Sequence, residues 1–386
     1  MLKTGCLSLL LAIAASTPAM AAMPSVKVLI GKSLKNIRVE GTDLRKIVHT
    51  QNKSLQYQGR KEISFNCDPA KSVRPIKFPA KPLHVASLQS PTGLVSWGKH
   101  KYQGELHLIT SPKQESCDLV NLIPMESYIT SLLSKEMNGT WPIEALKAQA
   151  VAARTYALHR IKNFNQPGLE SHETIYHLES SEKDQVSGTY FDATPLTVQA
   201  AKETEGEILL PQSGKISQIF FHSKCGGKTF RPDQVWGGVE EGYRQVDCPF
   251  CHKLGTKDWK KKVSRYQLTN LVDRALQKYY ADKIVSADVR FLPDREDASE
   301  VRLYDGDRFL QVKKSYLRNM SGREMLPSNY FAVSDNHGQG VSIKGQGYGH
   351  GVGLCQLGAL ELAKRGYTYK QILSFYFPQH HLNKAY

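Results

Sequence analysis

Three features are missing from this 386-residue sequence, and each absence excludes a class of protein. Beyond the first residues, no apolar run reaches the roughly 20 residues that a transmembrane helix needs. No long run of lysine or arginine occurs, which argues against a basic nucleic-acid-binding tail. No convincing internal repeat or low-complexity stretch is present, so nothing indicates a repeat architecture.

The N-terminus has the features of a secretory signal peptide. Lys3 gives a positive start, residues 7–15 form an almost unbroken apolar run, and Ala19-Met20-Ala21 fits a small-x-small cleavage site. We therefore predict a signal peptide over residues 1–22 and an exported chain, in the periplasm or cell-wall space, with no transmembrane anchor after cleavage. An uncleaved N-terminal anchor is the alternative.

The formal net charge of +15 predicts an anionic partner, because a basic protein attracts polyanions. The bacterial wall and outer-membrane surface are anionic, whereas the predicted export argues against nucleic acid. A solvated basic surface without a specific ligand is the alternative interpretation.

The pattern of the chain changes near residue 124. Residues 23–123 are predicted to be β-rich, because short strand-like runs alternate with turn signals. Over residues 124–165 the apolar positions follow helical spacing in two segments, which predicts a central helical pair. Later strands and helices are mixed without regular alternation, so we expect an α+β fold with a second domain over residues 124–386.

Glu136 falls on the apolar face of the first predicted helix. The residues that define this face are Met125, Ile129, Leu132, Leu133 and Met137. A carboxylate in apolar surroundings loses hydration, so its pKa rises, and a glutamate that stays protonated suits general-acid catalysis. Alternatively, Glu136 reaches solvent past this face or pairs with a buried arginine such as Arg154.

Two long motifs resemble the stage II sporulation protein D (SpoIID) family. The first comprises residues 126–129, 134–137 and 141–157, with the sequences ESYI, SKEM and WPIEALKAQAVAARTYA. The second is GQGYGHGVGLCQLGA at residues 345–359, and between them lie DQV (184–186), FFHS (220–223), GG (226–227) and VWGG (235–238). The resemblance runs from about residue 120 to the end and is weaker before that.

The resemblance implies a lytic transglycosylase that cleaves peptidoglycan between N-acetylmuramic acid and N-acetylglucosamine and leaves 1,6-anhydro ends. The family's catalytic glutamate corresponds to Glu136, and the similar enzymes act on glycan strands denuded by an amidase, itself a candidate partner. Ordinary glycosidases use two carboxylates, but an intramolecular attack needs no separately activated water. Glu126 and Glu144 are candidate second carboxylates, yet both fit better as charges in the first turn of a helix.

The alternating glycines at positions 345, 347, 349, 351 and 353 predict a substrate-binding groove. In an extended strand they would share one bare face, and Tyr348 and His350 would lie on the other, to stack on and hydrogen-bond a sugar. Glycine required for tight packing or unusual φ is the alternative. Further candidate substrate-binding residues are Gln356, Gln185 and Arg154. The alternative for Gln185 is an ordinary polar loop residue, and the alternatives for Arg154 are orientation of Glu136 and a structural salt bridge.

The cysteine and histidine spacing predicts a zinc site. His222, Cys225, Cys248 and Cys251 form two paired sets of ligands separated by a loop, with His252 as an alternate ligand. A site with four protein ligands would be structural. A disulfide from Cys225 to Cys248 or Cys251 competes with zinc, a redox-active CxxC is a third option, and Cys67 and Cys117 are predicted to form a separate disulfide.

These predictions support three hypotheses about function. The first is a lytic transglycosylase that binds peptidoglycan glycan strands. The second is a non-catalytic wall-binding amidase enhancer, because the same domain occurs in proteins of that description. The third is a basic polyanion-binding protein with a zinc-stabilised fold, which explains the charge but neither motif.

Overall fold

The computed structural model describes residues 22–49, 54–68, 81–111, 115–164, 175–181, 184–253, 258–335 and 340–386. The predicted signal peptide lies outside these ranges except for Ala22. Within them, no helix combines the length and the apolar character that crossing a membrane requires.

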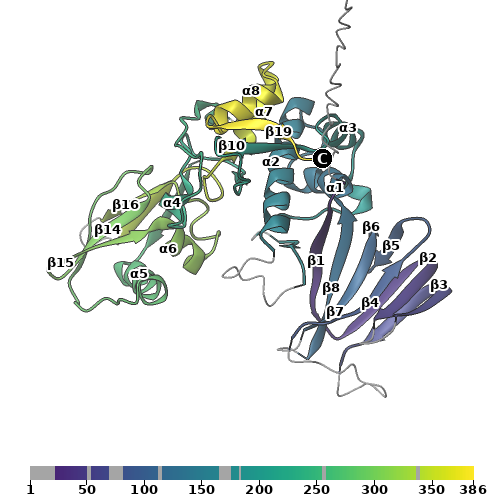
Figure 1. Cartoon of the computed structure of the whole chain (residues 1–386). Coiled ribbons are helices and arrows are strands. Elements are labelled where there is room, and N and C mark those ends of the chain that lie inside the picture. Colours follow the sequence, from purple (N-terminus) through teal and green to yellow (C-terminus); the bar gives the residue numbers. More distant parts are fainter. Residues whose placement is uncertain are drawn as a thin grey trace, which may run out of the picture.

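The β-rich N-terminal prediction is confirmed, because residues 25–124 form most of a nine-stranded sheet (Figure 1). The strand order is β6-β5-β2-β4-β7-β8-β1-β9, with β3 paired to β2. The strands are β1 (Ser25–Leu34), β2 (Asn36–His49), β3 (Ser54–Asn66), β4 (His84–Gln89), β5 (Leu94–Trp97), β6 (His100–Gln103), β7 (Glu105–Ser111), β8 (Ser116–Pro124) and β9 (Leu178–Glu179). The predicted disulfide between Cys67 and Cys117 is present and joins the end of β3 to β8.

The central helical pair is also confirmed. Helix α1 spans Met125–Glu136 and α2 spans Ile143–Lys162, and a proline precedes each. Proline suits a helix start, because its missing N–H would have no intrahelical acceptor there. The alanines of α2 are buried and permit close packing against α1 and three further helices, which are α3 (Pro195–Glu203), α7 (Gln356–Lys364) and α8 (Tyr369–Tyr376).

Residues 259–345 contain a separate hydrophobic core. Strands β12 (Trp259–Val263), β17 (Val341–Gly345) and β16 (Phe331–Asp335) form one small sheet, and β13 (Val289–Phe291), β14 (Glu300–Asp305) and β15 (Arg308–Lys313) form another. Helices α5 (Arg265–Tyr279) and α6 (Lys314–Ser321) belong to the same unit. Figure 1 shows this unit and the N-terminal sheet on opposite sides of the central helices.

The described chain also contains several short elements between the longer ones. They are η3 (Tyr190–Asp192), β11 (Phe221–His222), α4 (Pro232–Val235), η4 (Pro249–Lys253) and β18 (Leu354–Cys355). Strand β11 pairs in parallel with β18, while β10 (Glu207–Pro211) pairs with the C-terminal β19 (His380–Lys384). These pairings bring residues 207–222 next to residues 354–384. The α+β fold class is therefore confirmed.

Candidate active site

A cavity of about 580 Å³ lies between the central helices and the chain that follows them. One wall comes from α1, α2 and the loop at residues 184–188, and the other from residues 218–240, Arg323 and residues 348–356. The residues that line the cavity include Glu136, Tyr156, Arg160, Asp184, Phe220, His222, Trp236, Glu240, Arg323, Tyr348, His350 and Gln356. The predicted residues Glu136, Tyr348, His350 and Gln356 are therefore brought together.

Glu136 is the last residue of α1, and its half-buried side chain lines the cavity. Its Oε1 accepts a hydrogen bond of 2.8 Å from the backbone N–H of Val186. The carboxyl group is thus held in one orientation at the cavity wall while solvent and substrate can reach it.

The loop that supplies the Val186 N–H is anchored by Gln185. The amide of Gln185 is 1% exposed; its Oε1 accepts from the Tyr128 hydroxyl at 2.7 Å, and its Nε2 donates to the Ala153 carbonyl at 3.3 Å. Burial, followed by the nearby Glu136, raises the pKa of Tyr128, so this hydroxyl stays a donor. Gln185 therefore does not line the cavity as a substrate ligand; it is buried beneath the loop that orients Glu136.

Asp184 lies in the same wall but is already engaged by several donors. Its Oδ1 accepts from the Tyr156 hydroxyl at 2.9 Å, its Oδ2 accepts from the Glu179 N–H at 2.8 Å, and Arg160 lies 3.8 Å away. Burial and the Asp184 charge raise the pKa of Tyr156, which therefore remains a hydroxyl. Both carboxylate oxygens of Asp184 therefore already accept hydrogen bonds from the protein.

The opposite wall is aromatic. The rings of Phe220 and Trp236 lie 4.6 Å apart between centroids, and Trp236 and His350 lie 5.1 Å apart. Trp236 remains 38% exposed and Tyr348 39% exposed, so both present ring faces to the cavity or solvent. Faces of this kind suit the apolar C–H surface of a sugar ring, as in other pockets lined by aromatic residues with a few polar groups.

Two neutral histidines complete this wall. His350 Nδ1 accepts from the Val352 N–H at 3.0 Å, so its proton is on Nε2. His222 donates from Nδ1 to the Val352 carbonyl at 3.0 Å, which leaves Nε2 as an acceptor. That nitrogen is buried with no hydrogen-bond partner among the described residues. Burial lowers the pKa of His222 to about 4 and holds the pKa of His350 well below its usual range.

Several lining residues were not predicted from the sequence. Burial raises the pKa of Glu240, which is a second acidic candidate in the cavity. Tyr156 and Arg160 lie four residues apart on α2 and therefore face the same side. A signal was available for Trp236, because it lies in the VWGG motif at residues 235–238 that forms part of the family resemblance. Arg323 gives no such signal in the sequence.

The expected extended strand of alternating glycines is wrong. Only Gly345 belongs to a strand, and the φ values are +79°, +107°, +82° and +73° at Gly347, Gly349, Gly351 and Gly353. These are left-handed conformations that favour glycine. A Cβ on Gly353 would lie 2.1 Å from the Phe220 carbonyl oxygen, so tight packing is required as well. The segment still places Tyr348 and His350 at the cavity.

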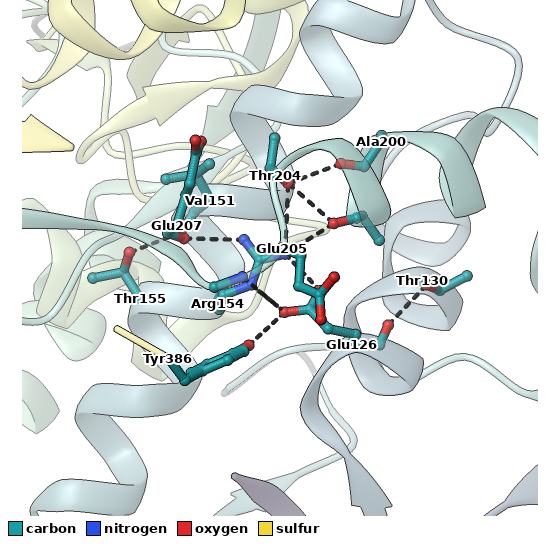
Figure 2. Close-up of polar contacts among 12 residues, drawn as sticks. Glu126, Thr130, Val151, Arg154, Thr155, Ala200, Thr204, Glu205, Glu207 and Tyr386 are labelled. Atoms are coloured by element: carbon teal, nitrogen blue, oxygen red, sulfur yellow. Dashed lines mark hydrogen bonds and ion pairs between the residues drawn. The ribbon is translucent and has the colours of Figure 1, made fainter. Parts of the chain in front are cut away.

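The expectation that Arg154 contacts substrate is also wrong. Its side chain is fully buried, and its guanidinium makes two hydrogen bonds to Glu126, at 2.8 and 2.7 Å (Figure 2). The same group donates to the Glu207 carbonyl at 3.0 Å, and the Tyr386 hydroxyl donates to Glu126. Arg154 is therefore a structural residue, and Glu126 is its counter-ion rather than a second catalytic carboxylate.

Glu144 is engaged in a similar way. Its Oε1 pairs with Lys147 at 2.7 Å, and its Oε2 accepts from the Tyr369 N–H at 2.7 Å. It therefore links the start of α2 to α8, and it does not line the cavity.

The geometry corrects the predicted set of metal ligands. The Sγ atoms of Cys225, Cys248, Cys251 and Cys355 all lie within 4.8 Å of one another. His222 instead directs Nδ1 at the Val352 carbonyl and lies in the cavity wall. Cys355 was missed because it is distant in sequence and has no paired ligand beside it. The side chain of His252, the alternate ligand, lies outside the described residues.

Comparisons with known proteins agree with the motifs. The family model SpoIID, described as stage II sporulation protein, matches residues 113–210. An uncharacterized protein of Brachyspira hyodysenteriae is 32% identical over 280 residues, which cover 72% of this chain and 71% of that protein. Stage II sporulation protein D of Bacillus subtilis is 26% identical over 281 residues (69% and 76%), and the amidase enhancer of the same organism is 27% identical over 301 residues (65% and 39%).

Proposed function

Because the chain belongs to the SpoIID family, we propose that it acts on the bacterial cell wall, as a lytic transglycosylase that cleaves glycan strands between N-acetylmuramic acid and N-acetylglucosamine. The observation that carries this proposal is the position of Glu136, a half-buried carboxyl group in the wall of an aromatic-lined cavity. Its orientation is fixed by the Val186 N–H.

In the proposed reaction Glu136 acts first as an acid and then as a base. The protonated carboxyl group gives its proton to the glycosidic oxygen while the bond from that oxygen to the muramic C1 breaks. The carboxylate then accepts the proton of the muramic C6 hydroxyl, whose oxygen bonds to C1. The products are a 1,6-anhydromuramic end and an N-acetylglucosamine with a free C4 hydroxyl, and no water is consumed.

A single carboxyl group is sufficient for this reaction, whereas hydrolysis uses two. Asp184 is a poor candidate for proton transfer, since its two oxygens already accept hydrogen bonds from the Tyr156 hydroxyl and the Glu179 N–H. Glu240 is the competing acid, because burial raises its pKa and it lines the same cavity. Substitution of each glutamate separates the two possibilities.

The remaining cavity residues suit a carbohydrate. Trp236 and Tyr348 offer exposed aromatic faces, while His350 and Gln356 offer polar groups close to them. The net charge of +15 would hold the protein on an anionic wall after export. A preference for strands denuded of stem peptides forms part of the proposal.

The decisive experiment incubates the purified protein with glycan strands that retain or lack stem peptides, and identifies the products by mass spectrometry. We expect 1,6-anhydromuramic ends, formed faster from denuded strands. Glu136→Gln should lower the rate at least about a hundredfold, the usual contribution of general acid–base catalysis. The thermal midpoint should change little, because the amide has nearly the same shape as the carboxyl group.

Two further variants complete this experiment. Glu361→Gln, which removes an α7 carboxylate paired with Arg365, should leave the rate unchanged. Glu240→Gln should retain a larger share of the activity than Glu136→Gln; the reverse order would assign the acid to Glu240. Reducing ends in place of anhydro ends would mean hydrolysis and would contradict the proposed reaction.

A non-catalytic role is the second candidate function. It is favoured by the similarity to the amidase enhancer of Bacillus subtilis, which covers 65% of this chain. Under this alternative, the same cavity would bind glycan without cleaving it, and the partner would be a peptidoglycan amidase. Glycan binding without products, together with faster stem-peptide release by an added amidase, would support it.

A further inference from the structure

Four buried thiols converge from three parts of the chain, and two of them lie close in sequence to residues that line the cavity. Cys225 follows β11, Cys248 and Cys251 belong to the turn around η4, and Cys355 is the residue that caps α7. All of them are buried, at 1% exposure or less. We propose that Cys225, Cys248, Cys251 and Cys355 bind one structural zinc ion that holds these segments together.

The spacing of the sulfur atoms suits a tetrahedral metal site. All pairs of Sγ atoms lie within 4.8 Å, and Cys225 and Cys251 are 3.3 Å apart. A Zn–S bond of about 2.3 Å in a tetrahedron separates its sulfurs by about 3.8 Å. The observed separations lie on both sides of this value, so small shifts of the side chains would complete the coordination.

The surroundings supply donors that thiolates need. The Gly227 N–H donates to Cys225 Sγ at 3.4 Å, and the Gly358 N–H donates to Cys355 Sγ at 3.4 Å. The Tyr376 hydroxyl lies 3.1 Å from Cys248 Sγ. Hydrogen bonds to a metal-bound ligand of this kind orient it and stabilise its charge.

Glycine also makes room for the sulfurs. A Cβ on Gly358 would lie 1.9 Å from the Tyr376 hydroxyl oxygen and 2.9 Å from Cys248 Sγ. The position therefore tolerates no side chain unless both neighbours move. This close packing of the backbone against the cysteines indicates that the cluster is a specific site.

Disulfides explain the cluster less well. Cys67 and Cys117 are bonded in the same molecule, so the structure distinguishes a disulfide from this group of free cysteines. In an oxidising compartment, neighbouring free thiols would form disulfides unless they were bound to a metal ion. A closed set of four thiolates is the usual ligand set of structural zinc.

The position of the site indicates what the metal does. Cys355 precedes the cavity residue Gln356, and Cys225 lies two residues after the cavity residue Ser223. His222 and Cys355 are also register partners in the β11–β18 pair. One ion would therefore fix the segments that carry Ser223 and Gln356 without contacting substrate. This inference does not depend on the proposed reaction, since zinc can be bound by a protein that cleaves nothing.

The test is to measure zinc in the purified full chain by elemental analysis and to examine its coordination by X-ray absorption at the zinc edge. We expect one zinc per chain with four sulfur neighbours at about 2.3 Å. Alkylation after denaturation in the presence of a chelator should modify four thiols, in addition to Cys6 where the signal peptide is retained. The absorption measurement uses the unmodified protein, so it stays informative even if cysteine variants fail to fold.

Variants then identify the fourth ligand. Cys355→Ser should weaken zinc binding at least tenfold in competition with a chromogenic chelator, whereas His222→Ala should keep the full zinc content. The matched control is Cys67→Ser with Cys117→Ser, which removes cysteines outside the cluster and should also keep the zinc. A metal-free protein with these thiols oxidised in pairs would overturn the proposal. So would bound iron in place of zinc, or a first shell of three sulfurs and one nitrogen.

Discussion

At the scale of single residues, the charge of Arg154 is fully buried, and its guanidinium is satisfied by several hydrogen-bond acceptors. Glu126 neutralises it with two short hydrogen bonds, while backbone carbonyls take further donors (Figure 2). A buried ion pair adds little net stability when it is intact, but removal of one partner leaves an uncompensated charge. The Arg154–Glu126 pair is therefore expected to affect stability mainly when one of its two partners is removed.

Arg154→Met should lower the free energy of unfolding by about 3 kcal/mol, because Glu126, whose side chain is only 16% exposed, would lose its counter-ion. Urea unfolding followed by circular dichroism measures the change. The matched control is Arg365→Met, which breaks an exposed pair with Glu361 and should cost less than about 1 kcal/mol. Equal small losses for both variants would contradict the structural role of Arg154.

The residues of the site differ in how far the sequence predicts them. Glu136 was predictable because a carboxylate on an apolar helix face is unusual, and the motif around it is specific. Arg154 lies in the same long motif region and Gln185 in a short motif, but a motif does not say whether a polar side chain lies inside the protein or in a cavity. Glu240 and Arg323 come from parts of the chain that only the tertiary fold brings to Glu136.

At the scale of elements, the helical pair was predictable, and the glycine segment was not. Helix periodicity has one physical meaning, whereas alternating glycines fit either a flat strand or a series of left-handed turns. The structure adopts the second, because residues 346–353 must pass against the backbone of residues 220–226. The sequence left tight packing or unusual φ open as the alternative to a strand, but it did not say which backbone the glycines approach.

Gly353→Ala should destabilise the protein by several kcal/mol and reduce glycan binding. Its φ is +73°, and the new Cβ would meet the Phe220 carbonyl, so the backbone next to the cavity must move. Gly366→Ala is the matched control: φ there is +85°, but nothing lies within 4 Å of the added carbon. It should cost only about 1–2 kcal/mol for the left-handed conformation.

Thermal unfolding and a glycan pull-down measure both effects in the two variants. If Gly366→Ala were the more damaging substitution, the steric explanation at Gly353 would be wrong.

At the scale of the whole molecule, buried neutral histidines are spread over the N-terminal sheet and the helical part. Burial is the first cause in each case, and it lowers the pKa of His84, His159, His177, His222 and His380 to about 4. In the unfolded chain the same groups titrate near about 6.5. Between these values the unfolded state binds more protons than the folded state, so stability falls as the pH falls.

We expect the thermal midpoint to be constant above about pH 7 and to decrease steadily from about pH 6.5 to about pH 4. Differential scanning calorimetry over this range measures the trend. His159→Leu should make the decrease shallower, because His159 Nδ1 is buried without a hydrogen-bond partner in the described structure. His381→Gln, at an exposed position, should leave the decrease unchanged. A midpoint that rose on acidification would contradict the assigned sign.

The separate core within residues 259–345 could not be predicted from the sequence pattern. The spacing of Leu268, Leu271, Val272 and Leu276 predicts a helix, but it does not say which core the helix joins. Hydrophobic residues of two neighbouring cores look the same in a linear sequence. Only the three-dimensional contacts assign them.

The division of the cavity between distant segments limits how the chain can be shortened. The stretch at residues 113–210 contains the glutamate at the end of α1 and the loop that orients it. The aromatic side facing it comes from beyond residue 217, and α7, which packs on α2, lies later still. An excised piece limited to that stretch would keep its acid but would have no surface on which a sugar could rest.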